Sequence, residues 1–143
     1  MKDDSEITYI AKLPKSTLRG TLNKGDLLKR IPVVFFKTVA GTEPVRSWLK
    51  AMAPADRRLI GEDIKTVEFG WPVGMPTCRP MGDGLHEVRT DLPGKRIARV
   101  FFYVDRNQRM VLLHGILKKT RATPASDLDL ARANKRKHEK GST

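Results

Sequence analysis

The sequence predicts an α+β fold: a small, antiparallel-dominated sheet with an N-terminal helical hairpin packed on one face and a C-terminal helix. Apolar residues repeat with helical spacing between Val45 and Val67, and three strand-like segments with short polar turns follow between residues 85 and 117. Helices followed by a run of strands are typical of α+β domains rather than of alternating α/β folds. At 143 residues, the chain is long enough for one compact core.

The composition of the N-terminal part of the chain separates an extension from the folded domain. Residues 1–31 contain scattered glycine and proline with weak periodicity, and we expect them to form an extension without an assigned role. The folded domain is expected to span residues 32–143. Its first element is "VVFFK" at residues 33–37, which is short and rich in β-branched and aromatic residues, as a strand should be.

Two helices are predicted next. Val45, Trp48, Leu49 and Met52 repeat at helical spacing, with Thr42 as the expected N-cap. A second helix is expected from Pro54 until Gly70 and Pro72 end it. Its apolar face is formed by Leu59, Ile60, Ile64 and Val67.

The rest of the chain is predicted to be mainly β-structure. Residues 69–84 carry three prolines and four glycines, so an irregular connection is expected there. Three antiparallel strands should follow at residues 85–90, 96–104 and 109–117. "TPASDLDLARANKRKHEK" then predicts a terminal helix with Thr123 at the cap.

The charge of the chain points to an anionic partner. Lysine and arginine number 28 against 16 aspartate and glutamate, which gives a formal charge of +12, with most of the excess in the second half. This balance is typical of nucleic-acid-binding proteins, although a basic protein can also be merely soluble.

Other features narrow the class of protein. The single cysteine, Cys78, excludes an internal disulfide and a four-cysteine metal site, and it favours the cytoplasm. No run of eighteen apolar residues is present and the first ten residues are acidic, so we expect neither membrane insertion nor export. No metal-binding or nucleotide-binding motif was found, and no cofactor is expected.

Three blocks of the sequence resemble one known family. The chain is similar to the RelE/ParE superfamily of toxin–antitoxin toxins, most closely its phage-derived HigB-like branch, over about residues 32–137. The resemblance lies in "PVVFFKTVAGTEPVRSWLK", "GDGLHEVRTDLPGKRIARVFFYV" and "MVLLHGILKKTRATPASDLDLA". It implies a RelE-like fold and the toxin of a type II toxin–antitoxin system, a ribosome-dependent endoribonuclease that cleaves mRNA and inhibits translation. It also implies contacts with ribosomal RNA and a cognate helix-turn-helix antitoxin.

The resemblance also implies a catalytic site on the sheet. Arg89, Arg99 and the segment carrying Lys118 and Lys119 match the catalytic positions. Metal-independent RNA cleavage needs a base, an acid and cations that stabilise the charge on phosphorus, and arginine suits the last task because its planar fork binds two phosphate oxygens. The alternative is that each arginine is a solvated or ion-paired sheet residue. Of the two lysines, we expect one to reach the site, because neighbouring strand residues point to opposite faces.

The remaining candidates are histidine and acidic residues near these cations. His86 departs from the aromatic residue typical of the branch and is a candidate acid–base residue, although a lone histidine near a strand start is more often structural. Glu87 is either a base or an ion-pair partner that orients an arginine. His114 is expected to be a satisfied core histidine, and His138 to be solvated.

A second set of basic residues is assigned to RNA binding. These residues flank the catalytic candidates or lie in the basic terminal helix, whose default interpretation is a charged, solvated surface. They are Arg96, Arg121, Lys135 and Arg136. Two alternative functions stay open: a ParE-like gyrase inhibitor that cuts no RNA, and a non-catalytic basic module that binds RNA or an antitoxin.

Overall fold

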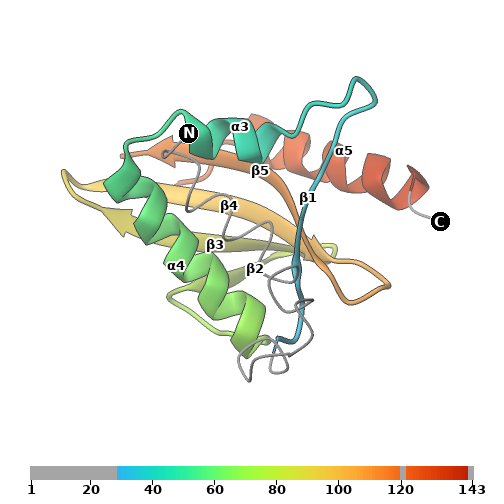
Figure 1. Ribbon diagram of the computed structural model, residues 1–143, viewed down its shortest axis with the longest axis horizontal. Coiled ribbons are helices and arrows are strands. Elements are labelled where there is room, and N and C mark those ends of the chain that lie inside the picture. The colour runs from blue at the N-terminus through green and yellow to red at the C-terminus, as the bar shows by residue number, and fades with distance from the viewer. Residues whose placement is uncertain (1–28, 120–121, 142–143) are drawn as a thin grey trace, which may run out of the picture.

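The computed structural model describes residues 29–119 and 122–141, which form a five-stranded sheet with helices on both faces (Figure 1). The expected extension falls mostly on residues 1–28 and the predicted RNA contact Arg121 falls on a second gap, so both lie outside the described residues. The elements are, in order, β1 (Val33–Phe35), α3 (Pro44–Lys50), α4 (Pro54–Gly70), β2 (Cys78–Gly82), β3 (Leu85–Leu92), β4 (Arg96–Val104), β5 (Met110–Lys118) and α5 (Ala125–Gly141). The α+β fold predicted from the sequence is confirmed.

The sheet has the strand order β1-β5-β4-β3-β2. Strands β3 to β5 form the expected antiparallel meander, β2 adds a further antiparallel strand beside β3, and β1 pairs with β5 in parallel. The prediction of an irregular connection over residues 69–84 is wrong at Cys78–Gly82, which forms β2. The strand was missed because Pro80 and Gly82 are rare inside strands. Proline is tolerated here because β2 lies at the edge of the sheet, and the register of β2 with β3 shifts between these two residues.

Helices α3 and α4 form the expected hairpin on one face of the sheet (Figure 1). The predicted cap Thr42 is wrong, because the N-cap residue is Glu43 and its side chain makes an ion pair with Arg46 in place of a cap. Leu59, predicted to face the core, is 36% exposed. Arg57 is buried, and its guanidinium Nη1 donates to carbonyl oxygens at the end of α3 and to that of Met52 just after it, which holds the two helices together.

Helix α5 covers the other face of the sheet, where it packs on β5 and β4. The two faces are separated by strand alternation: Val100 and Phe102 of β4 pack toward the hairpin, whereas Phe101 and Tyr103 pack toward α5. The described part of the chain contains no helix that is both long and apolar enough to cross a membrane.

One contact between α3 and the sheet requires a glycine. A Cβ atom at Gly115 of β5 would lie 2.5 Å from Cε3 of Trp48, well inside van der Waals contact. The missing side chain therefore lets the indole pack directly on the strand, and Trp48 belongs to the core as predicted.

Candidate functional site

Basic residues of three neighbouring strands gather on the face of the sheet that carries α5. Arg79 of β2 lies opposite Glu87 of β3, and Arg89 of β3 lies opposite Arg99 of β4. Residues paired across strands share a face, so all four side chains are on the same side of the sheet. Helix α5 packs on β4 and β5, away from the positions of Arg79 and Arg89. The structure thus brings together three of the predicted residues and adds Arg79.

Arg99 and Glu87 form a buried pair at the centre of this group. Each side chain is 1% exposed, and Arg99 Nε lies 3.5 Å from Glu87 Oε2. Burial lowers the pKa of the Arg99 guanidinium, while the charge of Glu87 opposes that shift. Because both groups are enclosed, they form an internal ion pair and neither side chain faces solvent.

Hydrogen bonds of the same pair hold the segment between β5 and α5 against the sheet. Arg99 Nη1 donates to Ala122 O at 3.0 Å and to Thr123 Oγ1 at 3.1 Å. The Thr123 hydroxyl in turn donates to Glu87 Oε2 at 3.2 Å. Glu87 Oε1 is buried and makes no hydrogen bond within the described residues. The carboxylate therefore keeps one unused acceptor in the interior, which lowers the net stabilisation that the pair provides.

The more accessible cations surround this pair. Arg79 and Arg89 are half-buried, and Lys118 and Lys119 are exposed. Lys118 lies opposite Ile97, which shares a face with Arg99, so this lysine is on the same face of the sheet as the buried pair. Arg89, Arg79 and Lys118 are thus the positions from which a phosphate could be contacted.

His86 lies on the opposite face of the sheet and does not join this group. Its ring stacks on Phe102 with centroids 5.3 Å apart and meets Trp71 edge to face at 4.8 Å. Burial lowers the pKa of His86. The sheet separates its imidazole from Arg89 and Arg99, so the structure shows His86 within the aromatic packing under the hairpin.

The other two histidines differ in how well the sequence predicted them. His114 is satisfied in the core, with Nε2 2.8 Å from Asp127 Oδ1 and its ring stacked on Phe101. The expectation that His138 is solvated is wrong, because its Nδ1 makes a hydrogen bond of 2.6 Å with the Tyr103 hydroxyl. Burial lowers the pKa of His138 and raises that of Tyr103 to about 12.

The residues assigned to RNA binding are scattered. Arg96 forms a bidentate pair with Asp56 of α4 at 2.7 and 3.1 Å, on the hairpin face, and its hydrogen bonds lower the pKa of Asp56. Its guanidinium is therefore held away from the other basic residues. Arg136 is exposed on α5. Lys135 pairs with Glu139 at 2.9 Å.

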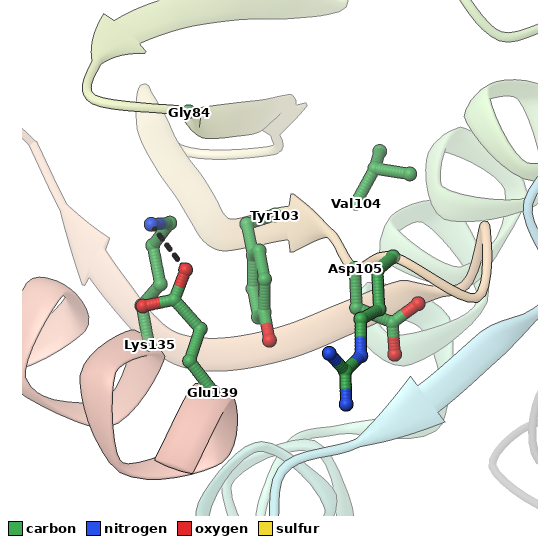
Figure 2. A pocket seen from close by; sticks show the side chains of 7 residues that line it. Gly84, Tyr103, Val104, Asp105, Lys135 and Glu139 are labelled. Atoms are coloured by element: carbon green, nitrogen blue, oxygen red, sulfur yellow. Dashed lines mark hydrogen bonds and ion pairs between the residues drawn. The ribbon is translucent and has the colours of Figure 1, made fainter. Parts of the chain in front are cut away.

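Lys135 lines a cavity at the far end of the sheet. The cavity has a volume of about 380 Å³, and Figure 2 shows Lys135 and Glu139 of α5 approaching it beside Tyr103 of β4. The ammonium group of Lys135 lies 5.2 Å from the centre of the Tyr103 ring. The lining includes the carboxylates Asp105 and Glu139, the second of which pairs with Lys135, so this cavity offers a weaker anion site than the cluster around Arg89.

Three contributors to these sites were missed by the sequence reasoning. Arg79 was missed because its strand was not predicted, and a basic residue facing Glu87 became visible only with the register. Thr123 was treated as a helix cap, although its hydroxyl bridges Arg99 and Glu87. Tyr103 was missed because its sequence context indicates only that it lies in a strand. Within the described residues, no cluster of three histidine, cysteine or acidic side chains could hold a metal ion.

Comparison with known proteins gives the family. No curated protein matches the chain significantly. The family model described as Phage derived protein Gp49-like (DUF891) matches residues 47–136, from α3 into α5, which is more than half of the chain. This family is related to the RelE-type toxins. The protein therefore belongs to the phage-derived Gp49-like family.

Proposed function

We propose that the protein is the toxin of a type II toxin–antitoxin system and acts as a ribosome-dependent endoribonuclease that cleaves mRNA. Membership of a family related to RelE-type toxins supports the toxin assignment. The observation that carries the nuclease assignment is the arrangement of Arg79, Arg89, Arg99 and Glu87 on one face of three adjacent strands.

The geometry suggests a division of labour in this cluster. Arg79 and Arg89 bind the scissile phosphate, because arginine forks suit its oxygens and these side chains are within reach of solvent. Lys118, with Lys119 beside it, contributes further positive charge and a proton for the leaving 5′-oxygen. The buried pair of Arg99 and Glu87 acts indirectly by fixing the strands and the connection to α5, so these two are positioning residues.

The proposed reaction uses the nucleophile that RNA itself carries. The 2′-hydroxyl gives its proton to solvent water, and its oxygen attacks the adjacent phosphorus. The bond to the 5′-oxygen breaks as that oxygen takes a proton from Lys118, and the products are a 2′,3′-cyclic phosphate and a 5′-hydroxyl end. Negative charge builds up on the phosphate oxygens in the transition state, where Arg79 and Arg89 stabilise it. His86 has no part in this proposal, because it lies on the other face of the sheet.

One observation favours a second candidate. The burial of Arg99 and Glu87 leaves fewer groups for direct catalysis. A basic module that binds RNA or an antitoxin without cutting would use the same surface, and its exposed lysines would suffice for phosphate contact.

Brief expression followed by primer-extension mapping of cellular messages tests the proposal. Wild-type protein should produce new 5′ ends within translated regions and stop growth. Arg89→Ala should lower cleavage at least about tenfold, which corresponds to the loss of one charge-assisted phosphate contact. Arg58→Ala, an exposed arginine of α4 on the hairpin face, is the matched control and should cut normally.

The other outcomes are equally specific. If Arg89→Ala and Arg79→Ala both cleave at the wild-type rate with unchanged circular dichroism, the proposed site is wrong. DNA damage without message cleavage would identify a ParE-like gyrase inhibitor. RNA binding with neither effect would identify the non-catalytic module.

A further inference from the structure

A groove separate from the basic cluster lies between the end of β1 and the end of α5. Its volume is about 600 Å³, and it is bounded by the end of β1 with the segment that follows it, by Arg109 just before β5, and by the last turn of α5. The basic cluster around Arg89 contributes no residue to its lining. The groove is therefore a distinct surface of the domain.

The walls of the groove are largely apolar. Phe35, Phe36, Val39 and Ala40 form one side. The two phenylalanines are buried beneath the surface, whereas the side chain of Val39 is fully exposed. An apolar side chain presented at the mouth of a groove is a common feature of protein-binding sites.

The charges around the groove are of one sign. Lys37 and Lys137 line it and are exposed, and none of the described residues that line it is a carboxylate. Arg109, which also lines it, is paired with Asp105 at 2.7 Å. Burial lowers the pKa of His138, so this histidine adds no charge near neutral pH. The two lysines therefore leave a positive rim around an apolar floor.

The groove is preformed by hydrogen bonds on both sides. The backbone N–H of Phe36 donates to Leu112 O at 3.0 Å, and that of Thr38 donates to Thr42 O at 2.8 Å, which holds the turn that carries Val39. On the other side, the bond between Tyr103 and His138 fixes the end of α5. A preformed site requires little ordering when a partner binds.

We propose that this groove binds an acidic segment of a partner protein, which inserts a bulky apolar side chain against Val39. Charge complementarity with Lys37 and Lys137 selects an acidic partner. The apolar walls favour a peptide over RNA, because protein–nucleic acid interfaces are more polar. This proposal goes beyond the proposed nuclease function and does not depend on it.

Fluorescence anisotropy with the full chain tests the groove. The probe is a labelled synthetic amphipathic peptide of about four helical turns, with leucine on one face and glutamate on the other. A peptide with lysine in place of glutamate and a uridine oligonucleotide are the comparison ligands. The glutamate peptide should bind, and both Val39→Asp and Lys137→Glu should weaken it at least about tenfold. Lys95→Glu, in the turn between β3 and β4, is the matched control and should not change binding.

Several results would overturn the proposal. These are no binding of the glutamate peptide, equal binding by Val39→Asp, and equal or tighter binding of the lysine peptide or the RNA. If reversing the charges of Asp3 and Asp4 strengthens peptide binding about tenfold, the chain's own N-terminus occupies the groove. A dimer in light scattering that Val39→Asp dissociates would mean that a second copy occupies it. Message cleavage by Val39→Asp is measured in parallel. A loss of peptide binding with normal cleavage concerns the groove alone, whereas absent cleavage by the wild type concerns the proposed nuclease function.

Discussion

Replacing Glu87 with glutamine tests how strongly the buried pair holds the site. Removing one partner of a buried ion pair costs about 3–5 kcal/mol, because the remaining charge stays in the interior. Arg99 and Glu87 are each 1% exposed, but their closest contact is 3.5 Å, longer than an optimal charged hydrogen bond. We therefore expect a loss near the lower end, about 3 kcal/mol, measured as a lower urea midpoint with an unchanged slope.

Two comparisons separate this effect from a general loss of charge. Glu43→Gln breaks the ion pair with Arg46. Because the side chains of Glu43 and Arg46 are 25% and 31% exposed, the free energy of unfolding should fall by less than about 1 kcal/mol. The double variant Glu87→Leu with Arg99→Met removes both charges and should be more stable than Glu87→Gln. The reasoning is refuted if Glu87→Gln unfolds within about 0.5 kcal/mol of the wild type.

Three further predictions concern packing, pH and reactivity. Gly115→Ala should lower the free energy of unfolding by about 2–3 kcal/mol in urea, because the new Cβ would meet Trp48 at 2.5 Å. The free energy of unfolding should also fall as the pH drops below the ordinary histidine pKa of 6.5, because burial lowers the folded pKa values of His86 and His138 and the unfolded chain takes up protons first. Cys78, whose pKa burial raises to about 11, should react with a thiol reagent only slowly in the native state and rapidly in urea.

Each of these predictions has its own control. Gly74→Ala adds a methyl group where no atom lies within 4 Å, so it should leave the free energy of unfolding nearly unchanged. His86→Phe keeps the stack on Phe102 and should reduce the pH dependence; an unaltered pH profile would contradict the role assigned to its burial. Rapid labelling of Cys78 without denaturant would show that the hairpin does not enclose it.

The elements with a strong periodic pattern were the ones that could be predicted from the sequence. Strand β4 was predicted with the bounds that the structure has, and α4 begins at Pro54 and ends at Gly70 as expected. Proline at the start and glycine at the end mark a helix by local backbone chemistry, which the sequence carries directly. Strand β2 could not be found in this way, because its proline is tolerated only through its place at the edge of the sheet.

The site was predicted less completely, for a related reason. Strand alternation could place Arg89 and Arg99 on one face only after the register was known, and it could not show that Arg99 is enclosed. In the structure its guanidinium donates to Ala122 and Thr123, which are distant in sequence. Arg96 was expected to contact RNA, but Asp56, which lies 40 residues away in sequence, holds its guanidinium on the other face. Such long-range partners leave no local trace in the sequence.

The position of α5 after every strand of the sheet has a consequence for biosynthesis. Leu113 and Phe101 face this helix, yet α5 is synthesised after every strand. A nascent chain can complete the sheet and the hairpin core first, while this second apolar surface stays uncovered until α5 has been synthesised. Truncation within α5 should therefore yield a product that aggregates or is degraded.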